Sequence, residues 1–176
     1  MAMSYYHSFD LPVTILRPFN TYGPRQSARA VIPAIITQIL KGASNIQLGA
    51  THPTRDLNFV TDTAASYIAT LKCNASVGKS INIGNNFDVS IGDLAHLIAE
   101  IMGADIHIIC DERRLRPPKS EVDILRANNE LALNLLKWRP HYGGGKDGLK
   151  KGLTETINWF ANPDNLKFYK AGGYII

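Results

Sequence analysis

Several features that assign a protein to a common class are missing from this chain. No apolar run approaches the ~18 residues of a membrane span, because Pro33, Thr37 and Gln38 interrupt the longest candidate. No GxGxxG follows a strand-like segment, so a dinucleotide phosphate loop is not expected. The five histidines are scattered without the spacing of metal ligands. The sequence therefore predicts neither a membrane protein nor a metal site.

Cysteine is also scarce, with only Cys73 and Cys110 in the chain. Each lies in an apolar context, and neither has a CxxC or CxxH neighbour, so we expect two buried free thiols rather than a disulfide. Free thiols fit a reducing compartment. The N-terminus has no basic region followed by a long apolar stretch, which does not favour a signal peptide. A cytoplasmic location is predicted.

Composition and charge favour a globular protein that binds a small anion. The 176 residues are 45% hydrophobic and 19% charged, enough for one domain with a core. The net charge of +4 is concentrated at residues 113–116 and 146–151. A nucleic-acid binder would place its cations on one face beside exposed aromatics. Because the cations here are split between separate segments, we expect no nucleic-acid partner. A phosphate-bearing small molecule fits this mild positive charge better.

Hydrophobic periodicity alternates between strand and helix along the chain. Residues 4–9 resemble the end of a helix, and short strands are expected near 13–16, 46–48, 57–60, 80–83 and 106–109. Helices are expected over 29–40, from Thr61 or Asp62 as a cap to about 73, from a Ser90 cap to Gly103, over 128–138 and over 149–160. The fold class is α/β, without the regular alternation of a complete doubly wound sheet.

Residues 17–25 combine a strand end with polar side chains suited to an anion. Asn20 follows the strand closely and is flanked by Arg17 and Arg25. Brought together in the fold, Asn20, Arg55 and Arg116 would form a diphosphate clamp, because guanidinium groups match phosphate oxygens in bidentate fashion.

Each member of this clamp has an alternative reading that spacing does not exclude. Asn20 could be a turn residue. Arg55 could form a surface ion pair with Asp56, and Arg116 could belong to a solvated loop. The sequence pattern leaves these alternatives open.

No catalytic set is evident. The tyrosines nearest the N-terminus, Tyr5, Tyr6 and Tyr22, have no lysine four residues later, so they do not provide a Tyr-x-x-x-Lys pair. The carboxylates of Asp62, Glu100 and Glu112 are better explained as helix caps or solvated groups. No catalytic residue is therefore assigned.

Six segments resemble, in order, the C-terminal part of the extended short-chain dehydrogenase/reductase family, the NAD-dependent nucleotide-sugar epimerases and 4,6-dehydratases. The resemblance covers roughly residues 4 to 160, and its first and fifth segments are most similar to bacterial 4,6-dehydratases that act on nucleotide-linked N-acetylated sugars. The segments are Arg17-Pro-Phe-Asn-Thr-Tyr-Gly-Pro-Arg-Gln26, Val31-Ile-Pro33, Thr54-Arg-Asp-Leu-Asn-Phe-Val-Thr-Asp62, Ile81-Asn-Ile-Gly84, Arg116-Pro-Pro-Lys-Ser-Glu-Val122 and Leu136-Lys-Trp-Arg-Pro140.

The resemblance implies a domain organisation and a set of site residues. Residues 1–17 would end a truncated Rossmann domain, 18–162 would form the nucleotide-sugar-binding domain, and 163–176 would be a tail. Pro18 would face the NAD cofactor. The residues implied to bind the nucleotide-diphosphate sugar are Asn20, Val31, Ile32, Gln47, Leu48, Arg55, Asn82, Arg116 and Ser120.

The resemblance also implies what this chain would lack. In the family, the catalytic Tyr-x-x-x-Lys and the glycine-rich NAD loop precede the segments matched here. We therefore expect the substrate-binding portion of an NAD-dependent sugar epimerase or 4,6-dehydratase, inactive alone, which forms a homo-oligomer or requires a separate Rossmann half. The alternative is a non-catalytic nucleotide-sugar-binding or scaffold module.

Overall fold

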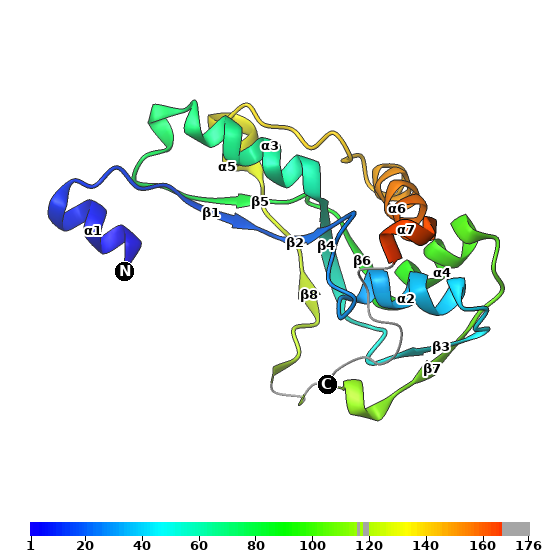
Figure 1. Cartoon of the computed structure of the whole chain (residues 1–176). Helices are drawn as coiled ribbons and strands as arrows, with labels where there is room; N and C mark the ends of the chain where they lie inside the picture. Colours follow the sequence, from blue (N-terminus) through cyan, green and yellow to red (C-terminus); the bar gives the residue numbers. More distant parts are fainter. Residues whose placement is uncertain (116, 118–119, 167–176) are drawn as a thin grey trace.

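A computed structural model describes residues 1–115, 117 and 120–166 (Figure 1). Helices and short strands alternate along these residues, which confirms the predicted α/β class. The helices are α1 Ala2–Phe9, α2 Val31–Leu40, α3 Val60–Leu71, α4 Ile91–Met102, α5 Glu130–Leu135, α6 Lys146–Ala161 and α7 Pro163–Leu166. The strands are β1 Ile15–Pro18, β2 Asn20–Tyr22, β3 Asn45–Leu48, β4 Thr54–Phe59, β5 Ser80–Ile83, β6 Asp88–Ser90, β7 His107–Cys110 and β8 Ile124–Leu125.

In the part of the chain that the structure describes, the strands form small separate sheets rather than one large sheet. Strands β1 and β5 pair in parallel, as do β3 and β7. Strand β4 is the centre of the third sheet, where it pairs in parallel with β2 and β8 and antiparallel with β6. Because β4 contacts three strands, it connects the segments on either side of it.

The chain changes partner strand at Phe19. On one side of this residue, Pro18 pairs with Ile83 of β5, and on the other side Asn20 pairs with Leu57 of β4. The Phe19 N–H donates to the Ile83 carbonyl at 2.8 Å, so the N–H is satisfied at the change of direction. This strand switch places Asn20 beside β4.

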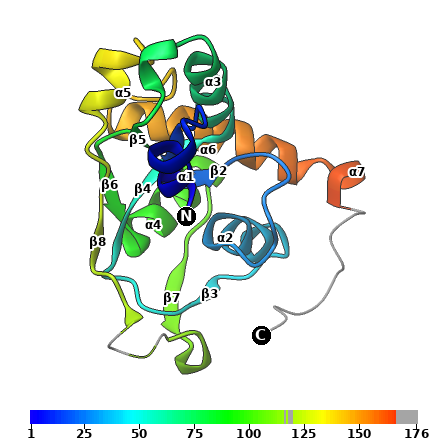
Figure 2. The ribbon, with the colours of Figure 1, turned by 90° about the vertical axis from the view of Figure 1, so that its left-hand side faces the viewer.

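Two hydrophobic clusters hold the elements together. The larger lies where α2, α4 and α6 pack around β3 and β4, and includes Ile35, Ile98 and Phe160. The smaller lies between β5 and α5 and includes Ile81 and Trp138. Figure 2 shows α3 and α5 at one end of the molecule and the β3–β7 pair at the other. The larger cluster includes Ile32, Leu48 and Leu57, which also line the candidate site.

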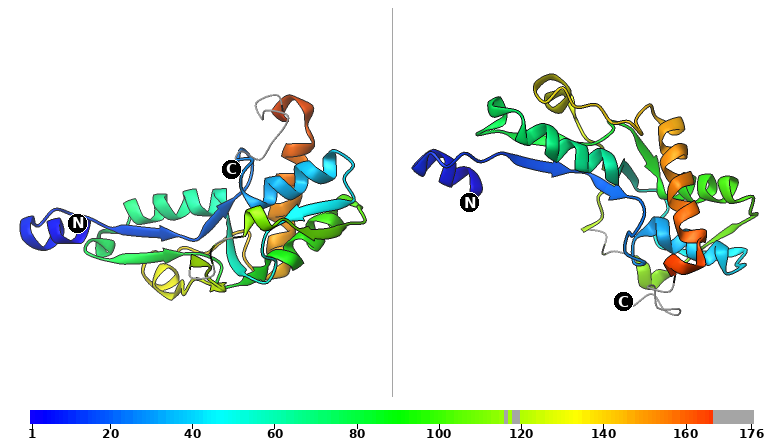
Figure 3. Two further views of the ribbon diagram at one scale, coloured as in Figure 1. Left: turned by 90° about the horizontal axis from the view of Figure 1, so that it is seen from below. Right: turned by 45° about the horizontal axis from the view of Figure 1, so that its top comes forward.

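Helix α1 lies apart from both clusters. It has no buried residues, and Figure 3 shows it beyond the end of the β1–β5 ribbon in both views. Two of its aromatic rings, Tyr5 and Phe9, pack on each other at 5.6 Å between centroids. The side chains of Tyr5 and Phe9 are therefore left exposed, as are several on α3.

The predicted helix boundaries are confirmed at α4 and corrected at α3. Ser90 caps α4 by accepting from the Asp93 N–H at 3.0 Å, and Gly103 ends it with φ 63°. The expected cap of α3 at Thr61 or Asp62 is wrong, since that helix begins at Val60 without a side-chain cap. The buried Asp62 carboxylate instead accepts the backbone N–H groups of residues 141 and 142, both at 2.9 Å.

The cysteines are free, as predicted, but the expectation that both are buried is wrong. Cys73 is only half-buried, with Sγ 3.6 Å from the Leu135 carbonyl. Cys110, the last residue of β7, shares a strand face with Ile108 but is exposed, because it lines an open hollow at the end of the strand. Within the described ranges, no helix is both long and apolar enough to cross a membrane.

Candidate functional site

A hollow of about 370 Å³ lies between β2, α2, the end of β3 and β4. It brings together five of the residues implied to bind substrate: Asn20, Val31, Ile32, Leu48 and Arg55. These positions are far apart in the sequence, so their convergence comes from the fold. The hollow combines apolar walls with an amide and a guanidinium group.

The register of β2 on β4 explains why the polar groups meet. Asn20 pairs with Leu57, which lies two residues after Arg55 on the same strand. Alternate residues of a strand project from the same face, so Arg55 and Leu57 share a face with Asn20 beside them. Helix α2 then covers this face with Val31 and Ile32.

Arg55 is held by acceptors at the edge of the hollow. Its Nη2 donates to Glu121 Oε1 at 2.7 Å, and its Nη1 donates to the carbonyls of Thr54 at 2.8 Å and Val122 at 2.7 Å. The ion pair with Asp56 that the sequence left open is not formed, since alternation along β4 directs Asp56 to the other face. Arg55 therefore joins β4 to the segment that follows residue 120.

Asp56 secures the neighbouring loops from the buried side of β4. Its Oδ1 accepts from the Asn85 N–H at 2.9 Å, and its Oδ2 accepts from Asn86 at 2.9 Å and Ala127 at 3.1 Å. Burial raises the pKa of this carboxyl above its usual value, while the three N–H donors act in the opposite direction. Two adjacent residues of β4 therefore have different roles: Arg55 lines the hollow, and Asp56 fixes the loops on the opposite face of the strand.

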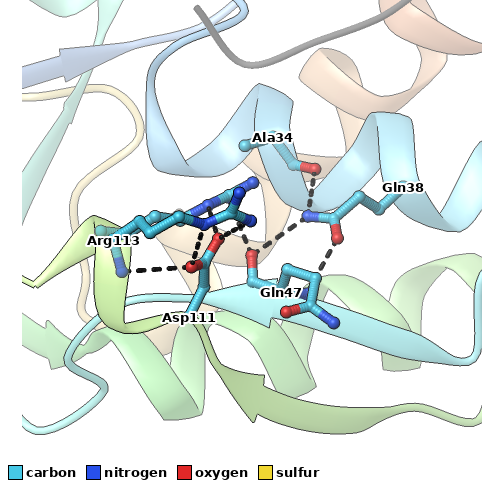
Figure 4. Close-up of polar contacts among 6 residues, drawn as sticks. Ala34, Gln38, Gln47, Asp111 and Arg113 are labelled. Carbon is cyan, nitrogen blue, oxygen red and sulfur yellow. Dashed lines mark hydrogen bonds and ion pairs between the residues drawn. The ribbon is translucent and has the colours of Figure 1, made fainter. Parts of the chain in front are cut away.

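A second guanidinium group, that of Arg114, lines the hollow from the segment after β7. Arg114 Nε donates to Asp111 Oδ2 at 3.1 Å, and its Nη1 donates to the Gln47 carbonyl at 2.9 Å. Figure 4 shows the amide of Gln38 meeting the same strand, where Gln38 Oε1 accepts from the Gln47 N–H at 2.8 Å. The approach needs glycine at position 49, because a Cβ there would lie 2.7 Å from the Arg114 carbonyl oxygen. Arg114 is therefore anchored to β3 at the hollow.

Sequence reasoning did not assign Arg114. It chose Arg116 from the same basic run, and residue 116 lies outside the described residues. The available signal was the run of arginines at 113–116, but spacing does not say which of them turns inward. The hollow is also lined by Gln26, Arg29 and Glu121, which the sequence left unassigned.

Three other implied substrate residues lie elsewhere in the structure. The backbone of Gln47 is bonded to Gln38 and Arg114, and the residue is outside the lining described above. Asn82 on β5 donates from Nδ2 to the Asn128 carbonyl at 3.4 Å. Ser120 Oγ donates to the Pro117 carbonyl at 2.9 Å. Their roles stay predictions.

A second, open hollow of about 440 Å³ adjoins the first at the strand switch. Asn20 lines both hollows, and Pro18, the residue implied to face NAD, lines only the second. The remaining lining is Arg17, Phe19, Thr21 and Leu125. The switch at Phe19 therefore separates two neighbouring surfaces that share one amide side chain.

The Tyr-x-x-x-Lys spacing does occur once, at Tyr142 and Lys146, a pair that was not predicted from the sequence. The structure gives Tyr142 no catalytic setting. Its hydroxyl donates to Glu155 Oε1 at 2.5 Å, and this bond, with some burial, raises its pKa to about 12. A catalytic tyrosine base needs the opposite shift, towards neutral pH. Tyr142 is therefore bound structurally rather than prepared for proton abstraction.

The charges of the first hollow suit an anion. Arg29, Arg55 and Arg114 line it together with the single carboxylate of Glu121. Three guanidinium groups beside an amide are a phosphate-binding arrangement. Across the described residues, no three His, Cys, Asp or Glu side chains gather closely enough to hold a metal ion.

Comparison with known proteins identifies the family to which this chain is similar. Residues 1–150 match the family described as GDP-mannose 4,6 dehydratase. The chain is 28% identical over 168 residues to human dTDP-D-glucose 4,6-dehydratase, an alignment that covers 90% of this chain and 44% of the human protein. The chain thus spans about half the length of the curated relatives it matches.

Two solved structures have the same fold over about half of their length. The dTDP-glucose 4,6-dehydratase of Bacillus anthracis in complex with NAD superposes with a TM-score of 0.79 at 28% identity, covering 96% of this chain and 50% of that one. The UDP-glucuronic acid 4-epimerase of Bacillus cereus, in complex with UDP-glucuronic acid and NAD, superposes with a TM-score of 0.75 at 27% identity, covering 90% of this chain and 48% of that one. The chain belongs to the NAD-dependent epimerase/dehydratase family, and it corresponds to the C-terminal part of these proteins.

Proposed function

We propose that this chain binds a nucleotide-diphosphate sugar in the hollow between β2, α2 and β4. The observation that carries the proposal is the convergence of Asn20, Arg55 and Arg114 on one hollow with apolar walls. A diphosphate offers several oxygens to guanidinium and amide donors. The nucleoside and the sugar present flat and partly apolar surfaces that fit such walls.

Each group in the hollow has a proposed role. Asn20, Arg55 and Arg114 would donate to the diphosphate, while Val31, Ile32 and Leu48 would pack against the base, ribose or sugar. The epimerase of Bacillus cereus, which is bound to UDP-glucuronic acid, supports a UDP-sugar as the first ligand to test.

The proposal extends to four implied residues outside this lining. Gln47, Asn82 and Ser120 would reach the ligand only if their segments move towards it. Arg116, which lies outside the described residues, would donate to the diphosphate.

We further propose that the reaction served is a 4,6-dehydration and that NAD is its cofactor, as in the complex from Bacillus anthracis. The hollow beside Pro18 does not fit a whole dinucleotide, because its described lining offers one arginine, Arg17, and no glycine-rich phosphate loop. Pro18 would form one wall near the cofactor. The chain alone would then be inactive, and a separate Rossmann half would supply the remaining residues.

Calorimetric titration tests this proposal. The chain is titrated with UDP-N-acetylglucosamine, a GDP-sugar and free N-acetylglucosamine, each with and without NAD. We expect a nucleotide sugar to bind without NAD and the free sugar not to bind, because the diphosphate supplies the charged contacts. No binding of any nucleotide sugar would refute the proposal.

Two further measurements sharpen this test. Arg114→Ala should weaken binding of the nucleotide sugar about tenfold. The matched variant Arg113→Ala should change the affinity less than about twofold, because Arg113 forms an ion pair with the same Asp111 but does not line the hollow. Turnover of the sugar by this chain with NAD would contradict inactivity. Binding without turnover, even when a Rossmann half is added, would favour the non-catalytic binding module.

A further inference from the structure

A chain of hydrogen bonds lies directly behind the strand switch. Thr21 Oγ1 donates to the Phe19 carbonyl at 3.2 Å and lies 3.0 Å from Thr63 Oγ1. Asn58 Nδ2 donates to the same Thr63 hydroxyl at 2.7 Å. The chain therefore links α3 and β4 to the one residue at which the backbone changes its partner strand.

The donors of this chain run in one direction. The Asn58 amide nitrogen can only donate, so Thr63 accepts from it and retains one proton. Thr21 uses its proton on the Phe19 carbonyl, so the Thr63 proton is directed to Thr21. Each hydroxyl both accepts and donates a hydrogen bond. Loss of either hydroxyl therefore interrupts the series of hydrogen bonds from Asn58 to the Phe19 carbonyl.

Burial makes this order matter. Asn58 is fully buried and Thr63 is buried, and the Asn58 Oδ1 has no hydrogen-bond partner among the described residues. The Asn58 side chain is therefore held through its Nδ2. Without the Thr63 hydroxyl, that amide would lose its bond in a place that water does not reach.

The series of hydrogen bonds ends at the Phe19 carbonyl, between the two hollows described above. The Phe19 N–H is bonded to Ile83 of β5, and its carbonyl is bonded to Thr21. This fixes both polar groups of Phe19 and with them the direction in which Asn20 leaves the switch. Asn20 and Thr21 also pair in register with Leu57 and Asn58 of β4.

We propose that Thr21, Thr63 and Asn58 are positioning residues that fix the strand switch and so hold Asn20 towards the nucleotide-sugar hollow. This inference rests on the proposed function, because it assigns Asn20 a ligand contact. The three residues do not touch the ligand themselves. Their effect passes through the Phe19 peptide.

The test compares Thr63→Val, which keeps the shape but removes the hydroxyl, with Thr63→Ser, which keeps it. Affinity for UDP-N-acetylglucosamine is measured by calorimetry, and the Phe19 and Asn20 amide signals are measured by NMR without ligand. We expect Thr63→Val to weaken affinity about fivefold to tenfold and to move both signals. Thr63→Ser should restore both. Thr70→Val is the control on the same helix, because Thr70 takes no part in these hydrogen bonds, and it should change neither the affinity nor the amide signals.

The outcomes separate this inference from the proposed function. Lack of ligand binding by the unmodified chain would refute the proposed function, while the amide signals would still show whether the hydroxyl chain fixes the switch. Ligand binding by Thr63→Val within about twofold of the unmodified chain would overturn the inference. If Thr63→Val does not fold, Thr21→Val tests the inference by the same two measurements. Thr21 is the half-buried end of the series of hydrogen bonds.

Discussion

Arg55 and Glu121 form an ion pair, 2.7 Å between Nη2 and Oε1, at the edge of the candidate hollow. Their side chains are only 15% and 16% exposed, so the pair is largely shielded from water. The carboxylate occupies a position on the guanidinium group that a phosphate oxygen could take. Binding of a diphosphate at Arg55 therefore competes with Glu121.

Neutralising Glu121 should strengthen diphosphate binding. In Glu121→Gln, Arg55 keeps its carbonyl acceptors but loses the competing charge, and the ligand no longer faces a carboxylate. We expect the Kd for UDP, measured by calorimetry at low salt, to fall about threefold to tenfold. Glu130→Gln, on the exposed surface of α5, is the matched control and should leave the Kd unchanged. Weaker binding in Glu121→Gln would mean that the carboxylate itself contacts the ligand.

Asp56→Asn should destabilise the fold strongly. Both oxygens of the carboxylate accept backbone N–H groups, three in all. In either orientation, the NH₂ group of an asparagine would face at least one of these N–H donors and lose that hydrogen bond. We expect the free energy of unfolding to fall by about 3 kcal/mol, measured by urea denaturation. Asp93→Asn, which keeps an acceptor at the exposed cap of α4, should change it by less than about 1 kcal/mol. A small effect of Asp56→Asn would show that the three bonds are replaceable.

The Tyr142 hydroxyl should ionise well above the pH at which a free tyrosine does. Its pKa is raised to about 12, first by the bond to Glu155. Because the folded pKa lies above the unfolded one, the associated stability is present below about pH 10 and is lost as the pH rises through 12. The difference in ultraviolet absorbance between the unmodified chain and Tyr142→Phe measures this titration. Glu155→Gln should lower the pKa, and an unchanged curve would contradict the assigned cause.

The exposed face of α3 should promote self-association. Tyr67, Ile68 and Leu71 are 49%, 55% and 85% exposed. Leu71 lies four residues after Tyr67 and three after Ile68, so the three side chains form one apolar patch. We expect size-exclusion chromatography to show an oligomer whose proportion rises with concentration. The double variant Ile68→Glu and Leu71→Glu should shift it towards the monomer. A monomer for the unmodified chain at high concentration would rule out this role.

Sequence pattern predicted the elements well where local chemistry decides them. The Ser90 cap and Gly103 stop of α4 are local signals, and both are confirmed. The start of α3 was misplaced because Asp62, which resembles a cap, serves instead as an acceptor for residues far along the chain. Cys110 was expected to be buried since its neighbours are apolar, but it ends β7 beside an open hollow and is exposed there, although it shares a strand face with Ile108.

The candidate site depended on information that spacing does not contain. Asn20 and Arg55 were identified by residue type, yet their meeting depends on the register of β2 on β4. Arg114 was missed because its direction is set by Asp111 and by the carbonyl of Gln47. The partner of Arg55 was also unpredictable, since Glu121 lies 66 residues away.

The most direct test of the central claim is an NMR titration of the isotope-labelled chain with UDP-N-acetylglucosamine. It reports where the ligand binds as well as whether it binds. We predict that the amide signals which move will be those around the hollow, from Asn20, Val31, Ile32, Leu48, Arg55 and Arg114. Unchanged signals at millimolar ligand, or changes confined to a surface away from these residues, would contradict the claim that this hollow binds a nucleotide-diphosphate sugar.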